Sequence, residues 1–349
     1  MRFALTVLLL GCALSAPANP DQPTANPEAS PSAKSVLKYI QSLRGRSDKR
    51  LVTGQFTDYG SNASTRIMGQ IERQSGVCPA IFGVDYADWH DGSIKPAAPN
   101  AAAIEHWRKG GLVTITAHFF NPLRTNVNVS GLRDRKVDVT PLLDAQSPAH
   151  AVWMTELDQI AAGLQELRDA GVVVLWRPFH EMNGGWFWWG AQKPGVFIRL
   201  WREMFDYFTH EKKLNNLLWV YGPNHGGKTV DYYPGDSYVD LVGVDAYGDT
   251  VDPEHFKGTA ELRRLPKPFG FSEFGPHGPV HPPGNYDYLR FINGVEKNFP
   301  ETVFFMAWSV NWGLTTNKSV TELLHHPWMV NRADLPSWTG SGAPGAKGR

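Results

Sequence analysis

The sequence has little cysteine, no excess of either charge and no membrane-length apolar segment. Two of the 349 residues are cysteines, Cys12 and Cys78. Cys12 lies in an N-terminal stretch that we expect to be cleaved off, which leaves one thiol and excludes an internal disulfide or a cysteine-built zinc site. The 34 basic residues balance 34 acidic ones, which argues against nucleic acid or an anionic membrane as the main partner. No later apolar run approaches the roughly 20 residues that span a bilayer.

Two common catalytic motifs are also missing. No G-x-G-x-x-G sequence follows a predicted strand, so the usual signature of a dinucleotide-binding fold is absent. No G-x-S-x-G elbow occurs, so a serine triad of the hydrolase type has little support. The chemistry has to be sought in other side chains.

The two ends of the chain differ in composition from the rest. Residues 1–18 begin with Met-Arg and an apolar stretch and predict a signal peptide, hence a secreted protein. The alternative is a lipoprotein signal, with Cys12 lipidated and the protein anchored at the cell envelope. Repeated prolines in 19–33 indicate a disordered linker, and 337–349 predict a flexible tail. Residues 34–336 predict one catalytic domain, which we expect to be a monomer.

Within this domain, short apolar runs alternate with amphipathic segments. Eight runs have the composition of buried strands: Leu51–Phe56, Ala80–Val84, Leu112–Ala117, Val172–Trp176, Leu217–Tyr221, Tyr238–Val244, Phe269–Phe271 and Val303–Trp308. Helical spacing of apolar residues recurs in Val152–Ala170, Val196–His210 and Tyr286–Phe299. Such alternation predicts a parallel sheet with helical crossovers. Eight units in one domain favour an α/β fold, the (β/α)8 TIM barrel, over an open sheet.

The stretch 172–190, VVVLWRPFHEMNGGWFWWG, combines a buried strand, a polar turn and a group of aromatic residues. In a barrel the active site lies at the carboxyl ends of the strands. Glu181 follows the fourth run, and Glu273 follows the seventh. Burial should raise the pKa values of both, and a pair of carboxyl groups in different environments is what glycoside hydrolysis requires. His180 or Tyr247 could tune their charge by hydrogen bonding.

Two other interpretations use the same residues. Either glutamate could simply form an ion pair with a nearby Arg such as Arg177. Alternatively, zinc could be held by a set of five side chains: His118, His180, Glu181, Asp245 and Glu273. Barrel hydrolases of that type usually take two histidines from the end of the first strand, which here reads Gln55-Phe56-Thr57-Asp58. We therefore expect neither a metal nor an organic cofactor.

The motifs at these strand ends resemble glycoside hydrolase family 26, whose best-known members are endo-β-1,4-mannanases. The matching strings are Trp176-Arg177-Pro178-Phe179-His180-Glu181-Met182-Asn183-Gly184, Trp186 to Gly190, Tyr232-Tyr233-Pro234-Gly235, Val244-Asp245-Ala246-Tyr247 and Ser272-Glu273-Phe274-Gly275. The resemblance implies a (β/α)8 barrel with Glu181 as general acid/base and Glu273 as nucleophile.

The resemblance also implies roles in substrate binding. His118 and His180 resemble sugar-site histidines, and Trp186 and Trp308 resemble aromatic walls flanking the scissile bond. Tyr247 resembles the tyrosine that contacts the nucleophile, and Asp245 belongs to the same matching string. The chain departs from many family mannanases at Ser309, where they carry a basic residue, and residues 117–122 are unusually apolar. The residues Phe187, Trp188 and Trp189 cannot be assigned to cleft or core from sequence.

From these features we expect a secreted, retaining endo-β-1,4-mannanase acting on mannan, glucomannan or galactomannan, a β-linked plant-type polysaccharide. Double displacement predicts carboxyl groups about 5–5.5 Å apart. Two alternatives keep the catalytic pair and act on mixed-linked β-1,3-1,4-glucan or on β-1,3-xylan. A third is a non-catalytic carbohydrate-binding barrel, which would keep the aromatic residues but would not need both glutamates.

Overall fold

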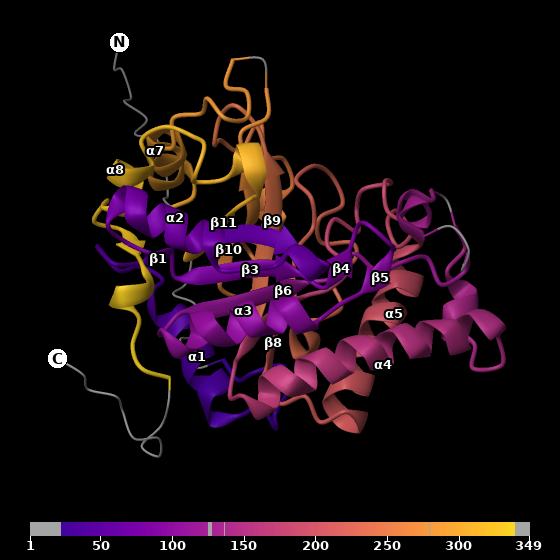
Figure 1. Ribbon diagram of the computed structural model, residues 1–349. Helices are drawn as coiled ribbons and strands as arrows, with labels where there is room; N and C mark the ends of the chain where they lie inside the picture. The colour runs from indigo at the N-terminus through magenta and orange to yellow at the C-terminus, as the bar shows by residue number, and fades with distance from the viewer. Residues whose placement is uncertain (1–21, 125–127, 136, 279, 339–349) are drawn as a thin grey trace, which may run out of the picture.

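The computed structural model describes residues 22–124, 128–135, 137–278 and 280–338 (Figure 1). The expected signal peptide, Cys12 and residues 339–349 lie outside this part of the chain. Within it, no helix has the length and apolar character needed to cross a membrane. Cys78 is buried and is the free cysteine of the described residues.

A closed parallel barrel forms the centre of the molecule, as predicted (Figure 1). Its strands run in chain order: β2 (Gly54–Tyr59), β3 (Ile81–Asp85), β6 (Leu112–Thr116), β7 (Val174–Arg177), β8 (Leu217–Tyr221), β9 (Leu241–Tyr247), β10 (Phe269–Gly275) and β11 (Phe304–Ala307). Each strand pairs with the next, and β11 pairs with β2 to close the ring. Two short strands, β1 (Leu51–Val52) and β12 (Met329–Val330), extend the sheet beside β11. A hairpin of β4 (Ala87–Asp88) and β5 (Ser93–Ile94) follows β3.

Helices surround the strands, and Figure 1 shows α3, α4 and α5 on the outside of the sheet. The helices are α1 (Pro31–Ser42), α2 (Arg66–Ser75), α3 (Ala97–Arg108), α4 (Pro148–Asp169), α5 (Pro194–Asp206), α6 (Thr259–Leu262), α7 (Leu289–Asn298) and α8 (Val320–Leu324). The helix α4 begins earlier than its apolar spacing suggests, because Ser147 caps it and Pro148 occupies its first turn. The helix α7 begins later, because Tyr286 and Tyr288 hydrogen-bond instead to Lys318.

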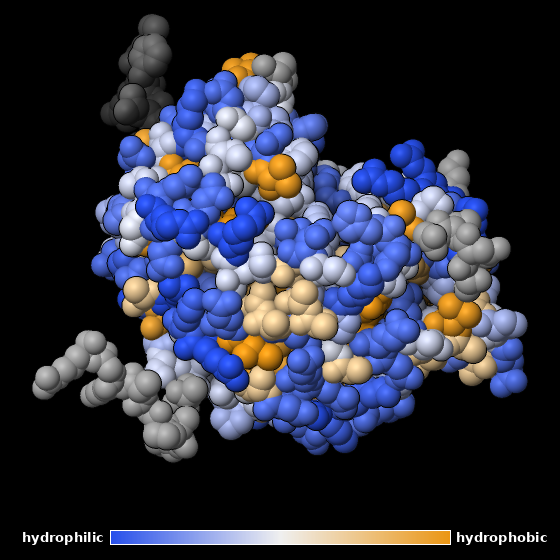
Figure 2. Space-filling model, viewed as in Figure 1, coloured by the Kyte–Doolittle hydropathy of each residue, from blue (hydrophilic) through white to orange (hydrophobic). Residues whose placement is uncertain are grey.

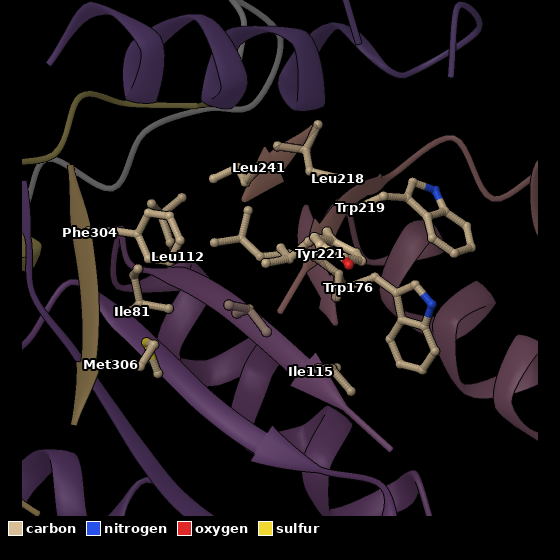
Figure 3. Packing of buried hydrophobic residues seen from close by; sticks show 14 of the residues in the cluster. Ile81, Leu112, Ile115, Trp176, Leu218, Trp219, Tyr221, Leu241, Phe304 and Met306 are labelled. Atoms are coloured by element: carbon tan, nitrogen blue, oxygen red, sulfur yellow. The ribbon is translucent and has the colours of Figure 1, made fainter. Parts of the chain in front are cut away.

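Side chains alternate between the barrel interior and the helix layer along each strand. In β7, Leu175 and Arg177 line a small interior cavity of about 10 Å³. Trp176 points the other way and lies beside Trp219 in Figure 3, facing the aromatic residues of α5 and the turn after it. This alternation directs Arg177 into the barrel axis, beneath the mouth at which the strands end.

The expected disorder of residues 19–33 does not extend to its described part, residues 22–33. Ala25, Ala29 and Ala33 are buried in the hydrophobic core. Pro31 is not a linker residue but stands in the first turn of α1, where its missing N–H costs nothing, and Ser30 caps that helix. The end of the domain also continues beyond 336, since Trp338 is buried against Tyr39. The repeated prolines led to the prediction of a linker, because amino-acid composition alone does not show whether a segment packs against the domain.

Asp240 ties this N-terminal segment to the barrel. Its buried carboxylate accepts hydrogen bonds from the backbone N–H groups of Ala25 and Trp219, each at 2.7 Å. Replacing Asp240 by Ala should leave both donors unsatisfied and lower the free energy of unfolding by roughly 2–6 kcal/mol, at about 1–3 kcal/mol per buried group. Urea unfolding measures this loss. The exposed Asp231→Ala variant is the control, and equal stability of the two variants would contradict the assigned tether.

The surface seen in Figure 2 is mostly hydrophilic, with apolar residues scattered between charged ones. Among the described residues, the large apolar side chains that are exposed are Val152, Val280 and Val310. They come from separate segments of the chain. Figure 2 shows one pale-orange cluster near the centre of this face, among mostly hydrophilic residues.

Candidate active site

Arg177 organises the floor of the barrel mouth. Its Nη1 donates to Oδ2 of Asp245 at 2.7 Å, and its Nη2 donates to Oε1 of Glu273. All three side chains are buried, because β7, β9 and β10 each direct one of them inward. The ion pair considered from sequence is therefore present, at Glu273. This ion pair is compatible with a catalytic role for Glu273, because Arg177 contacts Oε1 only and leaves Oε2 of the carboxylate outside the pair.

Glu273 is held from two sides. Its Oε2 accepts a hydrogen bond of 2.6 Å from the hydroxyl of Tyr247. Burial, and then the negative charge of Glu273, raise the pKa of Tyr247 well above its usual value, so this hydroxyl stays protonated and donates. Asp245 is fixed in the same way by the hydroxyl of Ser272, at 2.6 Å. The charge-assisted hydrogen bonds from Arg177 and Tyr247 set the direction of the Glu273 carboxylate.

Glu181 lies on the turn that follows β7. Its backbone has a φ of 55°, a left-handed conformation that non-glycine residues seldom adopt, and its N–H donates to the carbonyl of Gly222 at 2.8 Å. The side chain accepts from Nε1 of Trp186 at 2.6 Å and from Nδ2 of Asn224 at 3.0 Å. Backbone strain of this kind clusters at functional sites, where the surrounding structure holds it in place.

The environment of Glu181 shifts its protonation toward neutral pH. Burial, followed by the charge of Glu273, raises the pKa of Glu181 to about 7. The two hydrogen-bond donors and Arg177 act in the opposite direction and only partly offset these effects. Glu181 can therefore be protonated near neutral pH, while Glu273 lies against a guanidinium group. The two carboxyl groups stand in the different environments that separate an acid from a nucleophile.

The carboxyl groups also lie close together. One oxygen from each of Glu181, Asp245 and Glu273 lies within 4.8 Å of the others. The five-residue zinc set considered from sequence is not assembled around them: His118 is bonded to Asp85, and His180 lies near Thr116. The positive charge among the three acids comes from Arg177. These three residues and Arg177 instead form one compact group of buried charged side chains.

The two histidines stand together beside this group. Nδ1 of His118 hydrogen-bonds to Oδ2 of Asp85, and the ring meets that of His180 edge to face, with centroids 4.5 Å apart. Burial, then the charge of Arg177, lowers the pKa of His180 well below its usual value, so this ring is neutral. Nδ1 of His180 lies 3.4 Å from Oγ1 of Thr116.

The aromatic residues divide between cleft and core. Trp308 is partly exposed and stacks on Phe56, with centroids 4.1 Å apart. Trp186 is also partly exposed and covers Gly184, where a Cβ atom would lie 2.2 Å from the indole ring. In contrast, three neighbouring aromatics that the sequence left unassigned are buried: Phe187, Trp188 and Trp189. The indole N–H of Trp188 donates to the backbone carbonyl of Phe119 and that of Trp189 to the carbonyl of His180, so these two rings support the residues of the site.

Several residues of the site carried too weak a sequence signal to be given a role. Asn224 follows the fifth run, but its contact with Glu181 depends on reciprocal hydrogen bonds with Asn183. Tyr59 ends β2 and joins two parts of the mouth, since its ring lies near both His118 and Trp308. Asp85 is the first polar residue after the run Ala80–Val84. Its position at the end of a predicted strand was the sequence signal that could have pointed to a place in the site.

Comparison with known proteins agrees with this geometry. The family model described as Glycosyl hydrolase family 26 matches residues 25–334 of this chain. Mannan endo-1,4-beta-mannosidase of Bacillus subtilis is 35% identical over 97% of this chain and 96% of its own length. Mannan endo-1,4-beta-mannosidase A and B of Caldalkalibacillus mannanilyticus is 35% identical over 89% of this chain, which spans 63% of that protein.

A solved structure gives the same result. Bacillus subtilis mannanase man26 superposes with a TM-score of 0.83 at 33% identity, covering 92% of this chain and 98% of that one. The family match, residues 25–334, spans all eight strands of the barrel. This chain belongs to glycosyl hydrolase family 26.

Proposed function

We propose that this enzyme is a secreted, retaining endo-β-1,4-mannanase that cleaves internal linkages of mannan, glucomannan or galactomannan. The observation that carries the mechanism is the approach of Glu181 and Glu273, with one oxygen of each within 4.8 Å. Inversion needs room for a water molecule and a carboxyl separation of about 6.5–9.5 Å. Family relatives named for mannan hydrolysis support the substrate.

In the first step, an oxygen of Glu273 attacks the anomeric carbon of the bound sugar. The bond from that carbon to the glycosidic oxygen breaks, and Glu181 transfers its proton to this oxygen, so the leaving chain departs as an alcohol. The product on the enzyme is a glycosyl ester of Glu273. Arg177 and Tyr247, which donate to the two oxygens of Glu273, hold the carboxylate in line for attack.

In the second step, Glu181, now ionised, takes a proton from water as the water oxygen attacks the same carbon. The ester bond breaks, Glu273 leaves as a carboxylate, and Glu181 is protonated again. Formation of the ester removes the negative charge of Glu273, which is one of the two causes that raise the pKa of Glu181. The pKa of Glu181 should therefore fall in the intermediate, which suits its change from acid to base.

The pH dependence of kcat/KM should report this acid. Because Glu181 must be protonated in the free enzyme and its pKa is raised to about 7, kcat/KM should fall about tenfold per pH unit above that value. Trp186→Phe keeps an aromatic ring but removes the N–H that stabilises ionised Glu181. Its alkaline limb should move to higher pH. An unchanged limb in this variant would contradict the assignment of the limb to Glu181.

A panel of polysaccharides tests the substrate. Reducing-sugar release should be greatest on linear mannan and glucomannan, with a rapid fall in viscosity if attack is internal. The panel includes the two alternative substrates, mixed-linked glucan and β-1,3-xylan. A protein named Endoglucanase H from Acetivibrio thermocellus is 30% identical to this chain over 94 residues, 24% of the chain, which supports including the glucan. Release from one of these two polysaccharides alone would replace mannan as the substrate. Release from none would favour a binding protein. NMR of the first product would test retention of the β-anomer.

Secretion rests on the composition of residues 1–18. Mass spectrometry of the protein exported by its host should find an N-terminus at residue 19. A lipid-modified N-terminus at Cys12 would instead establish the envelope-anchored form.

A further inference from the structure

We infer that Asp85 is a positioning residue that holds His118 in one tautomer, so that Nε2 of His118 accepts a hydrogen bond from a hydroxyl of the sugar retained on the enzyme. Asp85 is the last residue of β3 and is completely buried. His118 follows β6, the neighbouring strand, and is 4% exposed. The inference rests on the proposed function and deepens it, because it gives a role to a residue that never touches the substrate.

The two oxygens of Asp85 have separate tasks. Oδ1 accepts hydrogen bonds from the backbone N–H of Ala87 at 2.7 Å and from that of His118 at 3.2 Å. Oδ2 faces the imidazole ring and bonds to Nδ1 of His118. A carboxylate has acceptors only, so Nδ1 must carry the proton. In neutral His118, Nε2 is then the atom with the free lone pair.

The surroundings of His118 leave that atom for a ligand. Aromatic rings enclose the imidazole, with centroids at 5.0 Å for Trp89, 5.3 Å for Phe187 and 4.5 Å for His180. Nε2 makes no hydrogen bond to the described part of the chain, and the His118 side chain is 6% exposed. The ring of Tyr59 lies near both His118 and Trp308, with centroids 6.1 Å and 6.3 Å away, so these three rings are neighbours at the barrel mouth. A sugar hydroxyl is a suitable donor for Nε2 of neutral His118 at this position.

The Asp85→Asn variant should reverse the tautomer. The amide oxygen is the only acceptor left, and the two backbone N–H groups of Ala87 and His118 require it at the Oδ1 position. The NH₂ group must then occupy the place of Oδ2 and donate to Nδ1 of His118. His118 would shift its proton to Nε2 and present a donor where the sugar needs an acceptor.

Asp88→Asn is the matched control. Asp88 is also buried, follows β3 in the same segment, and its carboxylate accepts from Ser61 and from the N–H of His90 rather than from His118. Its conversion to an amide changes charge and local hydrogen bonding to a similar degree. It should leave the tautomer of His118 unchanged.

The experiment combines NMR and kinetics. In nitrogen-15-labelled full-length enzyme, His118 should be neutral with the proton on Nδ1, and the proton should move to Nε2 in Asp85→Asn but not in Asp88→Asn. Asp85→Asn should lower kcat/KM on mannan on the order of 10–100-fold, the range known for groups that orient a ligand-binding histidine. The loss should appear mainly in KM. In a His118→Ala background, Asp85→Asn should cost less than about threefold more, because coupled residues are not additive.

Each outcome decides the inference. A doubly protonated His118 in the wild type, or a tautomer unchanged in Asp85→Asn, would overturn it. So would an equal kinetic loss with and without His118, which would mean that Asp85 acts on stability alone. If Asp85→Asn does not fold, the wild-type NMR spectrum still tests the tautomer. Absence of any hydrolysis by the wild type would refute the proposed function, while the spectrum would still report the Asp85–His118 pairing separately.

Discussion

Replacement of Glu273 by Ala is expected to lower kcat on mannan on the order of 10⁴-fold or more, in the range found when an enzymatic nucleophile is removed. Without this carboxylate no glycosyl ester can form, and the barrier of the single-step reaction remains. Binding should be retained, since Trp186, Trp308 and the histidines are unchanged. Measurement of reducing ends gives kcat, and calorimetry with manno-oligosaccharides gives the affinity.

The structural cost of this substitution has to be separated from its chemical cost. Removing Glu273 leaves the buried guanidinium of Arg177 with Asp245 as its remaining partner, and breaking a buried pair costs about 3–5 kcal/mol of stability. Glu273→Gln keeps a hydrogen-bond acceptor for Arg177 and should be more stable but equally inactive. Glu261→Ala, at an exposed position of α6, controls for loss of a glutamate. Activity within tenfold of wild type in Glu273→Gln would rule out the nucleophile assignment.

Replacement of Glu181 by Ala should produce a loss that depends on the leaving group. On mannan, where the departing alcohol needs a proton, kcat/KM should fall by about 10²–10⁴-fold, the usual contribution of a general acid. On an aryl β-mannoside with an acidic phenol the first step should be nearly normal, because the phenolate leaves without protonation. Hydrolysis of the ester then becomes slow, since no base activates the water. Stopped-flow absorbance should therefore record a burst of phenol followed by slow turnover.

Added azide provides the complementary measurement. Azide attacks the anomeric carbon of the glycosyl-enzyme without needing a base, displaces Glu273 and yields a glycosyl azide. In Glu273→Ala no glycosyl-enzyme forms, so azide can react only by direct displacement of the aryl group, which gives the α-azide. In Glu181→Ala, azide should accelerate turnover of the aryl substrate through the glycosyl-enzyme. Retention predicts the β-azide. Equal losses on mannan and aryl mannoside, or an α-azide from Glu181→Ala, would show that Glu181 does not act as acid and base in a double displacement.

Much of this architecture follows from local patterns in the sequence. Apolar runs of strand length, alternating with segments of helical spacing, specify a parallel barrel because each strand must be buried on both faces. Residues directly after such runs lie at one mouth of the barrel, so the meeting of Glu181 with Glu273 follows from topology. The ends of elements were less certain, as α4 and α7 illustrate. There, a serine cap and hydrogen bonds to Lys318 outweigh the apolar spacing.

Other features depend on contacts that no local pattern encodes. Whether Trp188 lines the cleft or the core is decided by the turn that contains Phe179 and Glu181, both at positive φ. Which histidine binds which carboxylate is decided by the adjacency of β3 and β6, which brings Asp85 to His118.

By itself, the sequence determined the fold class, the placing of two carboxyl groups at the barrel mouth and the aromatic character of the site, because these follow from hydrophobic periodicity and from position at strand ends. The tertiary structure decided the rest: Arg177 as the shared partner of Asp245 and Glu273, the contribution of the charge of Glu273 to the raised pKa of Glu181, and the packing of residues 22–33 on the barrel. The physical reason is distance. Charge, burial and hydrogen bonding act between groups that the chain brings together from far apart, and only folding sets how closely they approach.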